Sequence, residues 1–329
     1  MAANVRLLAV GDLPAAWELG RIAFGSDREP PPGWLADRPG RADWGAFDDA
    51  GRLLAKAGDR EQGHWFGGRL VPASGVAGVA VAPEVRGTGL SSRVLSALLA
   101  AARDRGAVIS TLFRTHPGPY RSLGYEEVGA LVWTALPTSA LAATRRPPDL
   151  TLRPAEPADV SALLEAYRTV ARSGSGLMER SGQLFDTSAD AVLAGHDGIT
   201  VAVSGDGAIE GYASWDRGPG YDASGRVSVD DLIGLSGPAT TALLAMLGSW
   251  AGVAPTLRLR LPDPDPAVLL APFVGATEHS RDPWMLRVLD APAAVAARGW
   301  PEHVAGGVDL LLDDDVCPWN AGAYRLVIE

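Results

Sequence analysis

A glycine-rich turn between a short strand and a helix constrains the fold of this chain more than any other feature. A β-branched run ends at Pro83, an Arg-Gly-Thr-Gly turn occupies residues 86–89, and an apolar-periodic helix then runs to Gly106. Such a turn gathers unpaired backbone N–H groups at the positive end of the helix. Its two glycines let an anion approach the backbone closely. The segment therefore predicts a pyrophosphate-binding loop in an α/β fold.

Two common phosphate-binding motifs do not fit this turn. A dinucleotide fingerprint requires a third glycine, where this chain has Ser92, and an acidic residue after the next strand. The next predicted strand, 108–113, is instead followed by Arg114-Thr115-His116. A P-loop requires Gly-Lys-Ser/Thr, which the turn lacks. The pyrophosphate is therefore expected to belong to another cofactor.

The spacing V-x-V-x-x-x-x-R-x-x-G, from Val79 to Gly89, resembles motif A of the GNAT acyltransferases. Arg86 matches the first basic or glutamine position of that motif, and Ser91 stands where the family prefers Gly or Ala. The resemblance implies acetyl-CoA as co-substrate, with Thr115 and His116 lining it. It also implies that the pantetheine is bound by Val79, Ala80 and Val81. The pyrophosphate would be bound by the residues of the turn and the start of the helix, Arg86, Gly87, Thr88, Gly89, Leu90, Ser91 and Ser92.

A second motif follows the strand. Tyr120 and the pair Gly124-Tyr125 resemble the Y-x-x-x-G-[FY] ending of GNAT enzymes. A phenol with a pKa of about 10 is able to protonate the CoA thiolate as it leaves. An isolated tyrosine is more commonly a half-buried packing residue, but two motifs in this order favour Tyr120 as the catalytic acid. Tyr125 is expected to pack beneath the turn.

The start of the chain is echoed near its middle. Residues 5–17 and 150–163 each read as a strand, a capping aspartate and an amphipathic helix, with Asp12 and Asp159 as the predicted N-caps. Residues 140–148, which contain paired arginines and paired prolines, are predicted to be a linker.

The second copy lacks the phosphate-binding turn. A strand over 226–233 and a helix over 238–250 are predicted, but the turn between them has neither an arginine nor a G-x-G. Pro238 also removes one N–H donor. We therefore predict a fold duplicate without a CoA site.

The two copies, together with the segment Cys317-Pro318-Trp319-Asn320-Ala321-Gly322, resemble the Eis (enhanced intracellular survival) branch of the GNATs. This implies an α/β (α+β) protein in which each GNAT-like domain has a mixed central sheet flanked by helices. Residues 1–145 would form the catalytic domain, 149–292 a degenerate GNAT-like domain, and 300–329 the beginning of a sterol-carrier-like domain. Such enzymes acetylate amines of cationic acceptors, aminoglycoside-like polyamines or protein lysines, and assemble as hexamers.

In this family the terminal carboxylate of the chain serves as general base. Glu329 ends a predicted strand at the start of the third domain, so we expect a truncated chain whose terminus does not fill that role. The alternative hypothesis is a non-catalytic acetyl-CoA-binding or regulatory protein that lacks a base.

The acceptor amine is expected to bind in the segment 24–44. Among its charged and aromatic residues, Asp27 and Trp34 are the predicted substrate contacts, while Glu29, Asp37 and Asp43 lie near them in sequence. The alternative is a solvated, proline-rich loop.

Composition sets broader limits. A length of 329 residues suggests two or three domains, and a hydrophobic fraction of 47% without an apolar run of membrane length predicts a cytoplasmic protein with no membrane partner. The single cysteine, Cys317, excludes an internal disulfide. The five histidines lack metal-ligand spacing, so no metal is expected. A net charge of −10 without a basic stripe argues against a nucleic-acid partner.

Overall fold

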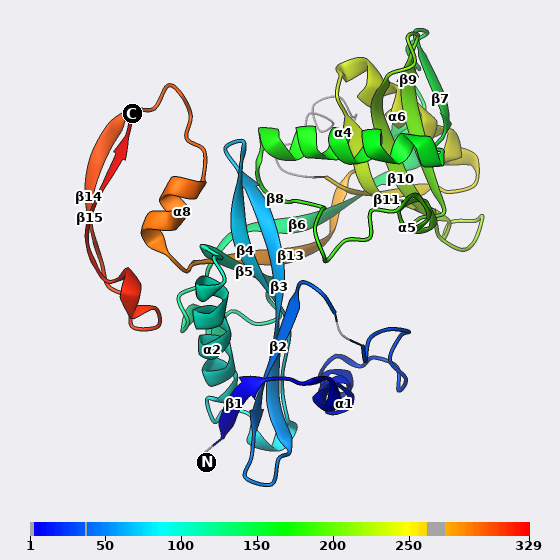
Figure 1. Ribbon diagram of the computed structural model, residues 1–329. Coiled ribbons are helices and arrows are strands. Elements are labelled where there is room, and N and C mark those ends of the chain that lie inside the picture. The colour runs from blue at the N-terminus through cyan, green and yellow to red at the C-terminus, as the bar shows by residue number, and fades with distance from the viewer. Residues whose placement is uncertain (1–2, 37, 262–273) are drawn as a thin grey trace. The chain divides into compact units, whose positions relative to one another are not determined.

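The computed structural model describes residues 3–36, 38–261 and 274–329, and its internal contacts divide the chain into two compact units (Figure 1). The first unit consists of the residues up to 129 with 182–184 and 283–329. The second consists of 130–181 and 185–282.

The first unit is built on a sheet with the strand order β1-β2-β3-β4-β5-β13. Its strands are β1 (Asn4–Leu7), β2 (Arg41–Phe47), β3 (Leu53–Phe66), β4 (Arg69–Val81), β5 (Ile109–Phe113) and β13 (Thr277–Val288), of which the part from 283 belongs to this unit. Neighbours are antiparallel except β4 and β5, which are parallel, so the sheet is mixed. The predicted run Val79–Val81 is thus the end of a much longer strand.

Helices α1 (Leu13–Phe24) and α2 (Leu90–Asp104) lie on opposite sides of strands β2 to β4 (Figure 1). The apolar positions of α2 recur every three to four residues, and Leu95, Leu98 and Leu99 are at most 1% exposed. They form one core with residues of β3 and with Tyr125. Short helices α3 (Gly118–Arg121) and α8 (Ala291–Ala297) complete the unit.

The second unit repeats this plan. Its sheet runs β6-β12-β11-β10-β9-β7, and β11 and β12 form its parallel pair. The strands are β6 (Glu126–Pro137), of which the part from 130 belongs here, β7 (Leu150–Pro154), β8 (Ser175–Met178), β9 (Gly198–Ser204), β10 (Ile209–Arg217), β11 (Arg226–Gly234) and β12 (Thr256–Arg260). Its helices are α4 (Val160–Ser173), α5 (Ala189–Ala194) and α6 (Gly237–Gly248). Leucines of α6 and β12 fill its core.

The two predicted capping aspartates occupy equivalent positions, but they do not cap their helices. Asp12 pairs with Arg6 at 2.6 Å and accepts the Ala9 N–H at 2.7 Å. Asp159 pairs with Arg153 at 2.6 Å and accepts the N–H of the residue three positions earlier. Both carboxylates therefore fix the strand–helix connection instead of binding the helical N–H groups.

The chain passes between the units at positions other than those predicted. Residues 133–137 pair with β12, and Leu141, inside the predicted linker, is 1% exposed in the core of the second unit. Residues 284–288 pair with β5. In sequence, β13 of the first sheet follows β11 and β12 of the second unit, and β6 of the second sheet follows β4 and β5 of the first. Domain boundaries predicted along the sequence do not reveal such an exchange of strands.

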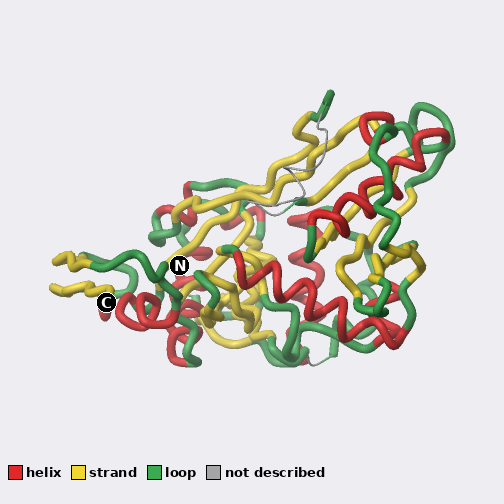
Figure 2. Tube along the Cα trace, turned by 90° about the horizontal axis from the view of Figure 1, so that it is seen from above, coloured by secondary structure: helices red, strands yellow, loops and turns green. Residues whose placement is uncertain are grey.

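The C-terminal residues form a hairpin of β14 (Gly306–Leu312) and β15 (Gly322–Ile328), a separate two-stranded sheet beside the end marked C (Figure 2). Its connecting segment is tied to the first unit by the Arg287–Asp314 ion pair at 2.5 Å and by the Trp319 indole N–H, which donates to Leu289 O at 2.6 Å. The hairpin therefore belongs to the first unit and is held to it through its connecting segment.

Candidate functional site

The parallel strands β4 and β5 separate at one point. They pair from Ala73 with Ile109 to Gly75 with Thr111, and β4 then continues to residue 81. Beyond the fork β4 keeps its pairing to β3, with a bulge between residues 77 and 80 where Gly78 has a φ of +62°. A bulge leaves an extra residue out of the ladder and redirects the strand, and bulges are frequent beside active sites. The fork thus exposes backbone groups of β4 next to β5.

The predicted phosphate-binding turn joins this strand to α2. Gly87 and Gly89 both have φ of +79°, and a Cβ on either would meet no atom within 4 Å. The helix begins at Leu90, and Gly89 has no side chain with which to cap its first N–H groups. Arg86 is exposed, with its Nε 3.4 Å from Val81 O. The turn is therefore shaped for an anion and open in front.

The other residues assigned to the cofactor lie on either side of the fork. Ala80 is buried, Val79 and Val81 are half-buried, and Leu90 contributes only backbone to the turn because its side chain is in the core. Thr115 and His116 follow β5 and are exposed. His116 Nδ1 accepts the Gly118 N–H at 3.3 Å, which holds the ring at the start of α3.

Tyr120, on α3, is half-buried and packs edge-on against Tyr125, with ring centroids 6.1 Å apart. Desolvation raises its pKa above the usual value, so the phenol is protonated at neutral pH and suited to donate a proton. Tyr125 is fully buried, and its hydroxyl lies 2.7 Å from Ser110 Oγ on β5. The hydroxyl thus links the turn that carries Tyr120 to the forked strand.

A buried polar network beneath the fork was not predicted. Ser110 Oγ donates to Ser74 O at 3.1 Å, and Ser74 Oγ donates to Asp59 Oδ1 at 2.6 Å. Arg105, at the end of α2, pairs with the other oxygen of Asp59 at 2.7 Å. These contacts join β3, β4, β5 and α2 where the two strands part. Periodicity gives no signal for it, because the residues are distant in sequence.

The predicted acceptor residues lie in different environments. Asp27 is exposed, whereas Trp34 is half-buried against Trp17 at 4.9 Å between ring centroids. The faces of Trp34 meet cations of the protein itself, with the Arg38 guanidinium 4.5 Å and the Lys56 ammonium 5.6 Å from the ring centroid. Asp37 lies outside the described residues.

Lys56, on β3, is the only lysine of the chain and is 7% exposed. Its pKa is lowered to about 8, chiefly by burial; the carboxylate of Asp43 opposes this shift, and the nearby Arg41 and Arg38 add to it. Its Nζ lies 3.9 Å from where a Cβ of Gly78 would stand. No motif or periodicity singles out Lys56, although its being the only lysine was a usable signal.

The equivalent region of the second unit is filled by its own side chains. β11 and β12 also pair over only four positions, and β11 has a bulge at Asp230. At the start of α6, Ser236 Oγ accepts the Ala239 N–H at 3.2 Å and donates to a Glu210 carboxylate oxygen at 2.6 Å. Arg260 pairs with Asp230 at 3.1 Å. The helix start thus already has an anion and a cap, unlike that of α2.

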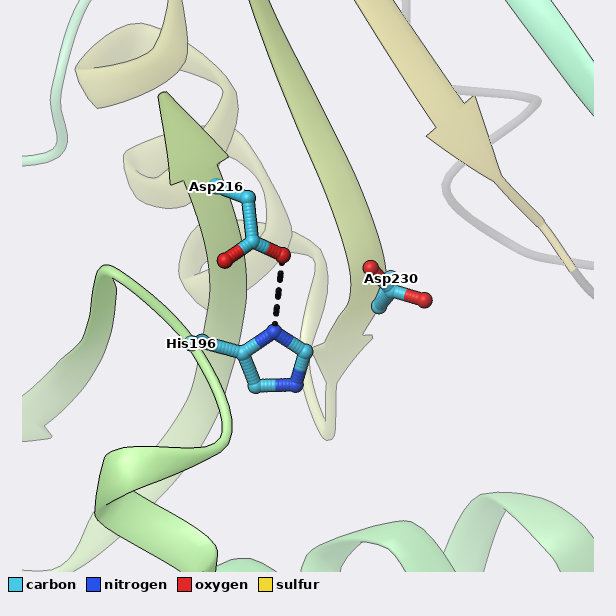
Figure 3. A group of neighbouring side chains, drawn as sticks. All are labelled: His196, Asp216 and Asp230. Carbon is cyan, nitrogen blue, oxygen red and sulfur yellow. Dashed lines mark hydrogen bonds and ion pairs between the residues drawn. The ribbon is translucent and has the colours of Figure 1, made fainter. Parts of the chain in front are cut away.

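Two further polar groupings occur in the second unit. A cavity of about 220 Å³ contains the half-buried Arg180–Asp231 pair among its lining residues. Nearby, ligand atoms of His196, Asp216 and Asp230 all lie within 4.8 Å of one another (Figure 3). His196 Nδ1 is 3.0 Å from Asp216 Oδ2, and Asp230 is the partner of Arg260. These polar atoms are engaged in the protein's own contacts.

Comparison with known proteins agrees with this geometry. Residues 4–128 match one protein family and residues 176–288 match another, and both families are described as "Acetyltransferase (GNAT) domain". An uncharacterized N-acetyltransferase of Streptomyces coelicolor is 30% identical over 272 residues, which are 79% of this chain and 65% of the relative. A relative from Streptomyces griseus is 29% identical over 291 residues, 80% of this chain and 69% of its own length. This chain therefore spans about two thirds of the curated relatives it matches.

Solved structures show the same fold. A GCN5-related N-acetyltransferase from Kribbella flavida has a TM-score of 0.84 and 29% identity, covering 99% of this chain and 82% of that one. Eis1 from Mycobacterium abscessus has a TM-score of 0.76 and 22% identity, and the match covers 100% of this chain and 85% of Eis1. The similarity to Eis1 is one of fold. None of the helices in the described residues has the length and apolar character to cross a membrane. The forked sheet, the open glycine turn and these matches together identify the chain as a member of the GNAT acyltransferase family that carries two GNAT domains in tandem.

Proposed function

We propose that the chain is an acetyl-CoA-dependent N-acetyltransferase that binds its co-substrate in the first unit alone. The start of α2 carries this proposal. It combines positive-φ glycines at 87 and 89, helical N–H groups without a side-chain cap, and an exposed arginine at 86. These are the features that a pyrophosphate requires. At α6, by contrast, Glu210 and Ser236 supply the anion and the cap from within the protein.

In the proposed reaction the acceptor amine attacks the thioester carbonyl directly. The C–N bond forms, the C–S bond breaks, and the amine loses a proton to water or to a base not yet assigned. Backbone N–H groups of Val79 to Val81 hold the pantetheine and polarise the carbonyl. Tyr120 protonates the departing sulfur, a role supported by the raised pKa that keeps its phenol neutral. Cys317 is fully buried and its pKa is raised by burial, which disfavours a covalent acyl-cysteine.

The finer features come from the resemblance to the Eis branch. We propose that the protein is cytoplasmic and assembles as a homohexamer. Light scattering of the purified protein tests the number of chains in the assembly. The acceptor class implied by that resemblance is a cationic amine, either an aminoglycoside-like polyamine or a protein lysine. Neither class is named by the relatives matched here, so the acceptor is a separate hypothesis from the acetyl transfer itself.

Titration calorimetry with acetyl-CoA tests the co-substrate site. Arg86→Ala removes a charge-assisted contact and is expected to weaken binding by about 1–3 kcal/mol. Gly89→Asp places a carboxylate where the phosphates bind, and should weaken binding at least as much. Gly89→Asn is the matched control, since it has the same positive-φ strain without the charge. Gly237→Asp should leave the affinity unchanged, because no co-substrate is assigned to α6.

Thiol release from acetyl-CoA in the presence of a panel of amines tests turnover. Amine-dependent release that falls in the Arg86 and Gly89→Asp variants supports the enzyme. Tight acetyl-CoA binding without release would instead favour a non-catalytic acetyl-CoA-binding protein. Unchanged affinity in both variants would refute the assignment of the turn.

A further inference from the structure

Four cationic side chains gather on the α1 side of the first unit's sheet. Arg38 lies in the loop before β2, Arg41 on β2, and Lys56 and Arg60 on β3. We refer to these four residues as the cationic cluster. Among the described residues the carboxylate that acts on all four is that of Asp43, which pairs with Arg38 and, at 2.9 Å, with Arg41. The described side chains of the cluster therefore carry an excess of positive charge, and like charges held this close repel one another.

The excess charge is partly buried. Lys56 is 7% exposed, and the side chains of Arg38 and Arg41 are 19% and 15% exposed. Burial lowers the pKa of Lys56, Arg38 and Arg60. Within the part of the chain that the structure describes, the buried Nη1 of Arg38 has no hydrogen-bond partner. Buried charges are normally paired, so donors left over in this way point to a ligand that supplies the acceptors.

The cluster lies beside the bulge of the forked strand. The Arg41 Nη2 and Lys56 Nζ atoms are each 3.9 Å from where a Cβ of Gly78 would stand. Gly78 directly precedes the residues assigned to the pantetheine. An acceptor held by the cluster would therefore lie next to the proposed thioester position.

The charges around Lys56 come from few elements. Asp43 and Arg41 act on it from β2, and Arg38 acts on it from the loop. α1 and β4 face it with glycines, Gly20 and Gly78, whose Cβ positions are 3.0 Å and 3.9 Å from Nζ. These surroundings oppose a polycation, since a cationic amine would add further positive charge to a site where, within the described part of the chain, cations outnumber carboxylates.

We infer, building on the acetyltransferase function proposed above, that the acceptor is an amine that also carries an oxyanion, either a carboxylate or a phosphate, and that this oxyanion binds Arg38, Arg41 and Lys56 beside Gly78. Guanidinium and ammonium groups match oxyanions through charge-assisted hydrogen bonds. The bound oxyanion neutralises the excess charge, while the free amine of the same molecule attacks the thioester. The acceptor class is thus an amino acid or amino phosphate, in place of the polyamine or protein lysine that the resemblance to the Eis branch implies.

The single lysine makes a direct binding measurement possible. Protein labelled with [ε-13C]lysine gives one lysine resonance, whose pH titration reports the charge of Lys56. Inorganic phosphate, 4-aminobutanoate or 2-aminoethyl phosphate is expected to raise the pKa of Lys56 by about 1 or more, as an opposite charge within a few ångströms does. The dication 1,4-diaminobutane should not raise it. A resonance that is unmoved by all three oxyanions would overturn the inference.

Turnover with the same amines provides the second measurement. The kcat/KM of wild type should be at least about 10-fold higher for 4-aminobutanoate or 2-aminoethyl phosphate than for 1,4-diaminobutane, the discrimination expected from one charge-assisted contact. Comparison of the two anionic amines distinguishes carboxylate from phosphate. Lys56→Met and Arg38→Met should abolish the preference, whereas Arg21→Met, on α1 and paired with Glu18 outside the cluster, should retain it. A preference for the diamine would refute the inference.

The two proposals fail in different ways. If no amine causes thiol release but phosphate still raises the pKa of Lys56, the enzymatic function fails and the oxyanion site stands. If diamines are acetylated and the lysine resonance does not respond to oxyanions, the function stands and the oxyanion site fails.

Discussion

Replacing Lys56 by methionine should stabilise the protein at neutral pH. The substitution keeps an unbranched side chain of similar length at a 7% exposed position but removes an ammonium that burial and two arginines disfavour. The Trp34 ring, 5.6 Å from that ammonium, offsets only a part of the free-energy cost of burying the charge, because such a cation–π contact contributes about 0.5–2 kcal/mol.

The magnitude follows from the pKa of Lys56. It falls from 10.5 to about 8 in the folded protein, and each unit of difference is worth about 1.4 kcal/mol, so the protonated group costs about 3 kcal/mol. Below pH 8 both states are protonated and the full cost applies. Between pH 8 and 10.5 the folded state has lost the proton while the unfolded state retains it, so wild-type stability recovers as the pH rises. The advantage of Lys56→Met is therefore largest below pH 8 and declines toward pH 10.5.

Urea denaturation of wild type and variant at pH 6.5, 8 and 10 measures this difference. Comparison at each pH cancels the titration of other groups, since they are common to both proteins. A variant that is less stable than wild type at pH 6.5, or a difference that does not change with pH, would show that the cluster does not strain the folded state. Added phosphate should stabilise wild type more than the variant, because it supplies the missing counter-charge.

Three other substitutions test the region around the fork. Tyr120→Phe should lower kcat by roughly 10²-fold with little change in KM for acetyl-CoA, because it removes only a transition-state contact; an unchanged kcat in steady-state assays would exclude the phenol as the acid. Tyr125→Phe should destabilise the protein by about 1 kcal/mol in urea denaturation through loss of the bond to Ser110, and full stability would contradict the network described here. Gly124→Ala should cost about 1–3 kcal/mol, because φ is +80° and the new Cβ would contact the Arg287 guanidinium; a neutral effect on the denaturation midpoint would count against that packing.

Local patterns in the sequence predicted much of the first unit. The helix after the turn and the strand over 108–113 follow from apolar periodicity, and they appear as α2 and β5. Gly87 and Gly89, singled out because glycine lets an anion approach the backbone closely, both have a φ of +79°. The duplication was readable because two strand–aspartate–helix segments share one spacing, and GNAT domain descriptions match one stretch in each half of the chain, residues 4–128 and 176–288.

Features that depend on distant residues were not predictable in this way. The capping role assigned to Asp12 and Asp159 was wrong, because each carboxylate instead finds an arginine six residues earlier in the chain. The predicted linker was partly wrong, since Leu141 meets α6 only once the second sheet has formed. The cationic cluster likewise exists only when β2, β3 and the preceding loop are aligned, so a scan of the segment 24–44 emphasised its acids and missed Lys56.

The number of acetyl-CoA molecules bound per chain tests the central claim most directly. The claim is that an uncapped glycine turn makes α2 a co-substrate site, while Glu210 and Ser236 close the equivalent start of α6. Titration calorimetry of the intact chain should give one site per chain, lost in Gly89→Asp and retained in Gly237→Asp. Two sites per chain, or one site that survives Gly89→Asp, would contradict the account.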